Sequence, residues 1–148
     1  MPLHRIYSAP GFFTEEEKSK IAQNITKAYT SALPAFYVVV LFIDVPENSF
    51  FVGGKSMTRF VRIVTQHLAR TFDSPKMRDK FIEYLERCYA PIIKAKGEDV
   101  GWELHIEETP RETWRENGIA PPLPRTEAEK EWKRLNRPVP YTEIMNKL

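Results

Sequence analysis

Cysteine and long apolar runs are scarce in this chain of 148 residues. Cys88 is the only cysteine, which excludes a disulfide within the chain and fits a reducing compartment. The most apolar run, FYVVVLFIDV (36–45), is far shorter than the roughly 20 residues that a membrane-spanning helix needs. No apolar core of signal-peptide length follows Met1. We therefore expect a soluble cytoplasmic protein that does not act at a membrane.

An excess of charge of one sign is also absent. The chain has 22 lysines and arginines against 20 acidic residues, and the two kinds are interspersed, which predicts no nucleic-acid partner. A glycine-rich phosphate loop and the HExxH, CxxC and GxSxG motifs are missing. The three histidines, His4, His67 and His105, are not spaced like metal ligands, so we expect neither a metal nor another cofactor.

The chain does contain a strand–helix–strand pattern in its first half. Apolar and polar residues alternate over 3–9, which predicts a half-buried strand. Residues 14–33 predict a helix that begins with a capping box of Thr14 and Glu17 and ends at Pro34. Residues 35–45 are rich in β-branched and aromatic side chains and predict a strand covered on both faces.

The same pattern follows a connector over residues 46–56. Residues 58–68 predict a strand, residues 73–97 a helix with Ser74 as its cap, and residues 101–108 a further strand. A crossover helix lets the two strands of each unit lie parallel. The sequence therefore predicts an α+β fold in one domain, 1–148, with a four-stranded mixed sheet and both helices on one face. The pseudo-repeats are 2–55 and 56–118, and the bare sheet face needs a cover, for which another subunit is the natural candidate.

Residues 109–118 predict a short helix. Thr109 and Glu112 would form its capping box, and Gly118 would end it. The proline-rich stretch 119–124 cannot form a regular element and predicts an extended segment.

A second short helix is expected over 126–136, with Thr126 and Glu129 as its capping box. The C-terminal arm, 119–148, is either a linker or a segment that packs on a neighbouring subunit. Its apolar side chains, Trp132 among them, favour packing.

Pro2 is a candidate catalytic group. Removal of Met1 would leave Pro2 with a free secondary amine, and a chain-terminal amine has a reference pKa of about 8. Burial or nearby cations would bring that amine closer to neutral pH, where general acid–base catalysis operates. Judged from this residue alone, an ordinary surface terminus is the more frequent alternative.

Five segments within residues 2–124 together resemble the tautomerase superfamily. Within it they are most similar to the fused-subunit branch typified by cis-3-chloroacrylic acid dehalogenase and its fungal relatives. The segments are PLHRIY, TEEEK, FFVGGK, RFVRIV and TPRETWRENG. The resemblance implies a homotrimer that needs no cofactor and whose catalytic group is the first residue of the mature chain, here Pro2.

The resemblance also implies residues that activate water. Glu116 stands where the family has a glutamate that handles a water proton, and His105 stands where an aromatic hydroxyl assists that glutamate. A histidine can donate a hydrogen bond or move a proton near neutral pH. The alternatives are a solvated glutamate and a surface histidine.

The family holds the substrate carboxylate with two arginines after the third strand. Here TQHLARTF offers His67 and Arg70, with Arg62 as a fallback that could instead be a strand-edge charge. A guanidinium matches a carboxylate with two parallel hydrogen bonds. Tyr29 replaces a histidine of the dehalogenase and would orient the substrate, unless it belongs to the core. These replacements predict a substrate other than that of the dehalogenase.

Together these expectations describe an enzyme that uses Pro2 as an acid–base group on small 2-oxo or 2,3-unsaturated carboxylates. The reaction would be tautomerisation, hydration or hydrolytic dehalogenation. The alternatives are a 3-oxo acid decarboxylase at the same site and a non-enzymatic trimeric interaction protein. A retained Met1 would turn the Pro2 nitrogen into an amide without useful basicity.

Overall fold

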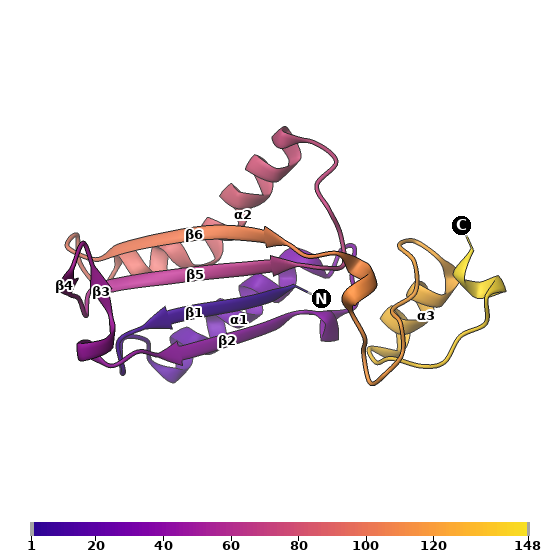
Figure 1. The fold of residues 1–148 in the computed structure, drawn as a ribbon, viewed down its shortest axis with the longest axis horizontal. Coiled ribbons are helices and arrows are strands. Elements are labelled where there is room, and N and C mark those ends of the chain that lie inside the picture. The colour runs from indigo at the N-terminus through magenta and orange to yellow at the C-terminus, as the bar shows by residue number, and fades with distance from the viewer. Residues whose placement is uncertain (1, 148) are drawn as a thin grey trace.

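A mixed four-stranded sheet forms the centre of the protein (Figure 1). The computed structural model describes residues 2–147; Met1, and with it the expectation of its removal, lies outside the described residues. The strand order is β2–β1–β5–β6, with β1 parallel to β2, β5 parallel to β6, and β1 antiparallel to β5. The predicted α+β architecture of two strand–helix–strand units is confirmed. The strands are β1 (Leu3–Ser8), β2 (Val39–Asp44), β5 (Phe60–His67) and β6 (Gly101–Glu108).

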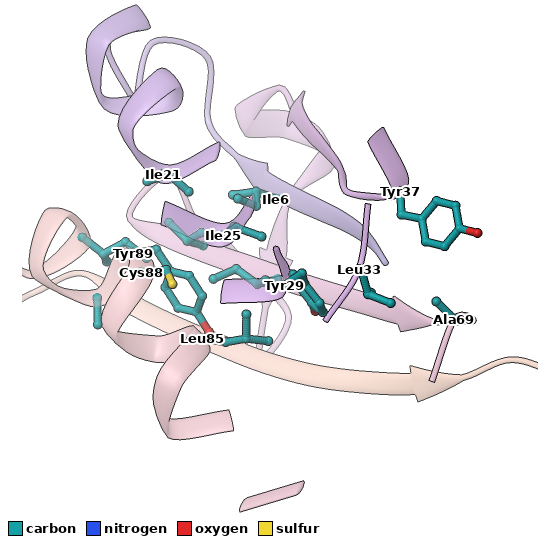
Figure 2. Close-up of a cluster of buried hydrophobic side chains, with 14 of the residues drawn as sticks. Ile6, Ile21, Ile25, Tyr29, Leu33, Tyr37, Ala69, Leu85, Cys88 and Tyr89 are labelled. Atoms are coloured by element: carbon teal, nitrogen blue, oxygen red, sulfur yellow. The ribbon is translucent and has the colours of Figure 1, made fainter. Parts of the chain in front are cut away.

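Helices α1 (Glu15–Tyr29) and α2 (Pro75–Lys94) cover the same face of the sheet (Figure 1). The predicted capping box of α1 is present, since Glu17 N donates to Thr14 Oγ1 at 3.2 Å and Thr14 N donates to the Glu17 carboxylate at 2.8 Å. Ser74 caps α2 by accepting a hydrogen bond from Met77 N. Side chains of both helices and of the sheet form the buried core (Figure 2).

Burial alternates along β1, and this alternation decides which side chains face the helices. His4, Ile6 and Ser8 are buried, whereas the residues between them are half-buried on the bare face. A strand turns successive side chains to opposite faces, so the polar His4 is placed in the same layer as the core residue Ile6.

Two boundaries in the first half differ from the prediction. Helix α1 ends at Tyr29, and residues 35–37 form the 3₁₀ turn η1 (Ala35–Tyr37) instead of the start of a strand. Tertiary packing explains the turn, because the Phe36 ring lies against Trp132 and the Tyr37 ring against Trp114. Both tryptophans lie more than 70 positions further along the chain than the rings they contact.

The connector forms a small hairpin at the far end of the sheet. A 3₁₀ turn, η2 (Glu47–Ser49), precedes β3 (Phe51–Val52), which pairs with β4 (Lys55–Ser56). Gly53 and Gly54 join them with φ of 58° and 77°, a left-handed pair that favours glycine in a two-residue turn.

The prediction of a helix over 109–118 is wrong. Only the 3₁₀ turn η3 (Arg111–Thr113) forms, and it has no side-chain cap. Glu116 then pairs with Ile119 across a two-residue turn in which Asn117 and Gly118 have φ of 49° and 78°. Asn-Gly is a strong hairpin signal, and here it overrides the apparent capping pattern.

Helix α3 (Glu127–Leu135) begins at Thr126 as expected, but its capping box is only half formed. Thr126 Oγ1 accepts from Glu129 N at 3.3 Å, whereas the Glu129 carboxylate turns away to accept from Arg125 N at 2.7 Å. The box is incomplete because Glu129 also pairs with Arg70, described below.

The C-terminal arm folds back on its own chain, at the end of the sheet where β1 begins (Figure 1). Trp132 is completely buried, and its Nε1 donates to Val139 O at 2.7 Å. Tyr141 Oη donates to Ala120 O at 2.7 Å. The arm therefore packs within its own chain and is not a free linker, while packing on a neighbouring subunit stays a prediction. Two of its large apolar side chains are exposed, Leu123 at 47% and Ile144, in the final turn η4 (Ile144–Asn146), at 81%. Across residues 2–147, none of the helices has the length and apolarity needed to span a membrane.

Candidate active site

A cavity of about 1010 Å³ opens at the end of the sheet where β1 starts and where β5 and β6 finish. Topology brings these points together. Because β1 is antiparallel to β5, the chain start lies beside the end of β5, and because β5 is parallel to β6, their ends adjoin. The cavity is lined by the start of β1, the end of α1, the loop after β5, the segment after β6 and the start of the arm.

Four of the residues predicted for the site line this cavity: Pro2, Tyr29, His67 and Arg70. Pro2 is buried, and its carbonyl accepts a hydrogen bond from Val39 N at 3.0 Å. This bond continues the β1–β2 ladder and fixes the start of the chain at the cavity wall. These four residues therefore lie around one cavity, while their roles remain predictions.

A buried chain of polar side chains extends from the cavity into the core. Tyr29 Oη lies 2.8 Å from His67 Nε2 and 3.1 Å from His4 Nε2, and His4 Nδ1 lies 2.9 Å from Thr65 Oγ1. Burial lowers the pKa of His4 to about 3 and that of His67 to about 4, and it raises the pKa of Tyr29. Both imidazoles are therefore neutral at pH 7.

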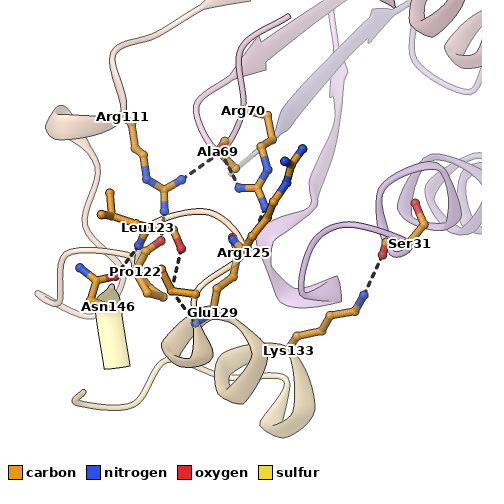
Figure 3. Close-up of polar contacts among 11 residues, drawn as sticks. Ser31, Ala69, Arg70, Arg111, Pro122, Leu123, Arg125, Glu129, Lys133 and Asn146 are labelled. Atoms are coloured by element: carbon orange, nitrogen blue, oxygen red, sulfur yellow. Dashed lines mark hydrogen bonds and ion pairs between the residues drawn. The ribbon is translucent and has the colours of Figure 1, made fainter. Parts of the chain in front are cut away.

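Arg70, Arg111 and Arg125 also line the cavity, and Figure 3 shows the polar contacts of these arginines. Arg70 donates from Nη2 to Glu129 Oε2 and from Nη1 to Ala69 O, both at 2.8 Å. Arg111 donates to Ala69 O at 3.0 Å and also to Pro122 O. Desolvation by burial lowers the pKa of Arg111. Arg111 is thus engaged with backbone carbonyls, whereas Arg70 pairs with a carboxylate that the C-terminal arm supplies.

The structure places Arg62 and His105 away from the cavity, on the bare face of the sheet. Arg62 pairs with Glu103, and His105 Nε2 lies 3.2 Å from Glu107 Oε1. Strand alternation explains this placement, because Arg62 is an odd number of residues from His67 and so faces the other way.

Glu116 also lies outside the residues that line the cavity. Its Oε1 accepts a hydrogen bond from Trp114 Nε1 at 3.0 Å, beside the bridge to Ile119. The helix that would have presented it does not form. Glu112, from the same segment, lines the cavity instead.

Sequence reasoning missed several residues of the site. Arg111 and Glu112 follow directly on β6, so the rule that ends of parallel strands gather could have found them. The strand alternation that buries Ile6 could also have placed His4. No local signal pointed to Arg125, which lines the cavity from the arm. Within residues 2–147, no cluster of three acidic, histidine or cysteine side chains could hold a metal ion.

Comparison with known proteins gives consistent results. A family model described as putative oxalocrotonate tautomerase enzyme matches residues 1–137. Native RhCC from Rhodococcus jostii RHA1 is 40% identical, with a TM-score of 0.89 over 94% of this chain and 99% of that one. A probable enzyme from the thermophilic fungus Aspergillus fumigatus is 43% identical, with a TM-score of 0.89 over 95% of this chain and 98% of that one.

A more distant solved structure shares the fold. N1, a member of the cis-3-chloroacrylic acid dehalogenase family, is 21% identical and has a TM-score of 0.70 over 88% of this chain and 89% of that one. The comparison with curated proteins found no match.

Proposed function

Because this chain belongs to the family of putative oxalocrotonate tautomerase enzymes, we propose that it catalyses proton transfer on small 2-oxo carboxylates without a cofactor. The observation that carries the proposal is that Pro2, Arg70 and His67 line a single cavity. A base, a carboxylate-binding cation and a polar group for the reacting oxygen are what such a reaction needs.

In this proposal Pro2 is the acid–base group after Met1 is removed. Burial of Pro2 and the guanidinium groups in the same cavity would favour its neutral amine over the ammonium. Arg70 would hold the substrate carboxylate. The Pro2 nitrogen would then take a proton from the carbon next to the carbonyl and become an ammonium. The ammonium would pass that proton to the carbonyl oxygen, which gives the enol and restores the neutral amine. The reverse sequence returns the keto form.

Tautomerisation is favoured over the water-dependent reactions by the position of Glu116. Hydration or dehalogenation needs a group that activates water, and the Glu116 carboxylate is bound to Trp114 outside the cavity lining. Hydration of a 2,3-unsaturated acid is the second candidate, because Glu112 is among the residues that line the cavity and its carboxylate could act as the base.

The test begins with the intact mass of the protein from cells, which establishes whether Met1 is removed. Ketonisation of phenylenolpyruvate is then measured for the wild type, Pro2→Ala and Arg62→Gln. We expect Pro2→Ala to lower kcat/KM by about 100-fold or more, the usual contribution of a general acid–base group. Arg62→Gln, on the bare face, should behave like the wild type.

Other results would redirect the proposal. Decarboxylation of a 3-oxo acid with no ketonisation would assign the cavity to a decarboxylase. A retained methionine, or activity that is indifferent to Pro2, would refute the proline mechanism and leave an interaction protein as the better reading.

A further inference from the structure

In the buried chain of Thr65, His4, Tyr29 and His67, the donor and the acceptor of each hydrogen bond can be assigned. Thr65 and His4 are completely shielded from solvent, and His67, at the other end, lines the cavity. Among the described residues, His4 Nδ1 is the only acceptor within hydrogen-bond distance of the Thr65 hydroxyl. The Thr65 hydroxyl must therefore donate to His4 Nδ1.

The remaining hydrogens follow in turn. His4 is neutral, so if Nδ1 accepts, the ring proton is on Nε2 and is donated to Tyr29 Oη. The Tyr29 hydroxyl then donates to His67 Nε2. His67 is neutral as well, which leaves its single ring proton on Nδ1.

The opposite direction leaves a hydrogen bond unmade. If His4 Nδ1 carried the proton, it would donate to Thr65 Oγ1, and the Thr65 hydroxyl hydrogen would be buried without an acceptor. An unsatisfied buried donor is disfavoured enough to make one direction dominate. In the first arrangement the donors of Thr65, His4 and Tyr29 all have acceptors, and the one donor left over belongs to His67, which lines the cavity.

We propose that His4, oriented by Thr65, is a positioning residue that fixes His67 with its proton on Nδ1, so that His67 donates a hydrogen bond to a substrate oxygen. His67 Nδ1 has no hydrogen-bond partner among the described residues and is not sealed from solvent. The proposal rests on the proposed function and deepens it, because it names the group that meets the carbonyl oxygen.

A neutral imidazole N–H suits this position. The oxygen of a 2-oxo acid gains negative charge as the adjacent carbon loses its proton, and a preoriented donor stabilises that charge without reorganisation. The Phe81 ring, with its centroid 5.0 Å from that of His67 and 5.2 Å from that of Tyr29, holds both rings in place. The substrate class that fits is therefore a small carboxylate with an adjacent carbonyl or enol oxygen.

The test is nitrogen-15 NMR of histidine-labelled protein, free of substrate, at pH 7. The chain has three histidines, and His105→Gln removes the signal of the exposed one. We expect His67 with a protonated Nδ1 and His4 with a protonated Nε2. A wild-type His67 protonated on Nε2 would overturn the proposal without any activity being measured.

Variants test whether Thr65 and Tyr29 set the tautomers of His4 and His67. Thr65→Ser keeps the hydroxyl and should preserve both tautomers, whereas Thr65→Val removes the hydroxyl and should give a mixture at His67. Tyr29→Phe cuts the chain and should move the His67 proton toward Nε2. Thr65→Val spectra identical to those of the wild type would contradict the role of Thr65.

The donor role is tested separately with oxamate, an unreactive analogue of a 2-oxo acid. Oxamate should shift the His67 Nδ1–H resonance of the wild type and of Thr65→Ser, and Thr65→Val should lose about 10-fold in kcat with a smaller change in KM. An Nδ1–H resonance unmoved by saturating oxamate would refute the donor role. Failure of the proposed function would instead appear as absent turnover with the tautomers as expected.

Discussion

Arg70 has unused hydrogen-bond donors with which it could bind a ligand in the cavity. Two of its five N–H donors are used, one by Glu129 and one by Ala69 O, which leaves the others for a ligand. The contact with Glu129 also fixes the guanidinium in one orientation. A preoriented guanidinium binds a carboxylate with less loss of side-chain freedom than a mobile one.

Replacement of Arg70 should therefore weaken substrate binding. We expect Arg70→Lys, which retains the charge but not the planar fork, to raise KM about 10-fold or more, because hydrogen bonds to charged groups contribute about 1.5–3 kcal/mol. Arg62→Lys is the matched control on the bare face and should change KM less than about twofold. Steady-state kinetics on both variants, with thermal unfolding as a check of folding, decides the matter, and equal KM values would remove Arg70 from the binding site.

The two buried histidines make stability depend on pH. Burial holds the pKa of His4 at about 3 and that of His67 at about 4, whereas an unfolded histidine titrates near about 6.5. Between these values the unfolded chain binds more protons than the folded one, so the free energy of unfolding falls as the pH drops below about 6.5. Above about pH 7 both states are neutral at these rings, and the effect is absent.

Urea unfolding at a fixed protein concentration should show this loss. From pH 8 to pH 5 we expect a decrease of about 2 kcal/mol for each buried histidine. His4→Gln should remove roughly half of the decrease, and His105→Gln, at an exposed position on β6, should leave it intact. A free energy of unfolding that is the same at pH 5 and pH 8 would show that the rings are not buried in neutral form.

At the scale of elements, a buried carboxylate ties α3 to the loop that follows β5. Glu129 is almost fully buried, with Oε2 shared by Arg70 Nη2 and Arg125 N and with Oε1 lacking a partner among the described residues. A carboxylate held this way depends on both donors. The same pair joins the arm to the cavity wall, so the arm and the candidate site should be stabilised together.

Glu129→Gln tests this link. The amide keeps the shape and can still offer an oxygen to Arg70, but it removes the negative charge that pairs with the guanidinium at a buried position, so we expect a loss of about 1–3 kcal/mol in the free energy of unfolding. Glu131→Gln, in the same helix but in an exposed pair with Arg134, should cost less than about 0.5 kcal/mol. Urea unfolding and the rate of tryptic cleavage in the arm report the difference, and equal behaviour of the two variants would contradict the link.

At the scale of the whole molecule, both long helices cover one face of the sheet and leave the other face bare (Figure 1). Leu41, on the edge strand β2, points to this face and is 44% exposed, and the ion pair of Arg62 with Glu103 lies on the same face, on β5 and β6. A sheet with one face covered by helices generally buries the other against a further layer. We propose that two more copies of the chain supply that layer, as the resemblance implies.

Light scattering after size exclusion should give about three times the 17.3 kDa mass of the chain. Leu41→Glu should shift the mass toward that of one chain, because it places a charge where the interface would form. Tyr84→Glu is the matched control, since Tyr84 is 42% exposed but lies on α2. A monomeric wild type, or equal effects of both variants, would reject the trimer through this face.

Strand alternation and capping are local properties, and they explain how much the sequence determined by itself. The period of apolar residues, the box at Thr14 and the crossover length predicted the mixed sheet and both long helices, whereas the expectation that Pro2, Tyr29, His67 and Arg70 share one site came from the resemblance. The prediction of a helix over residues 109–118 was wrong because the segment contains two local signals, a capping pattern and the pair Asn117–Gly118. The pair forms a turn, and no helix forms.

Only the tertiary structure decided the contacts that join distant parts of the chain. Glu129 meets Arg70 across 59 positions, and His4 meets Thr65 across 61. No periodicity encodes such pairs, because they depend on how the arm folds back and on which strands are neighbours. The sequence therefore determined the scaffold and the position of Pro2 at the start of the first strand, while packing decided which polar groups surround the cavity and which predicted ones, such as Arg62 and His105, face away from it.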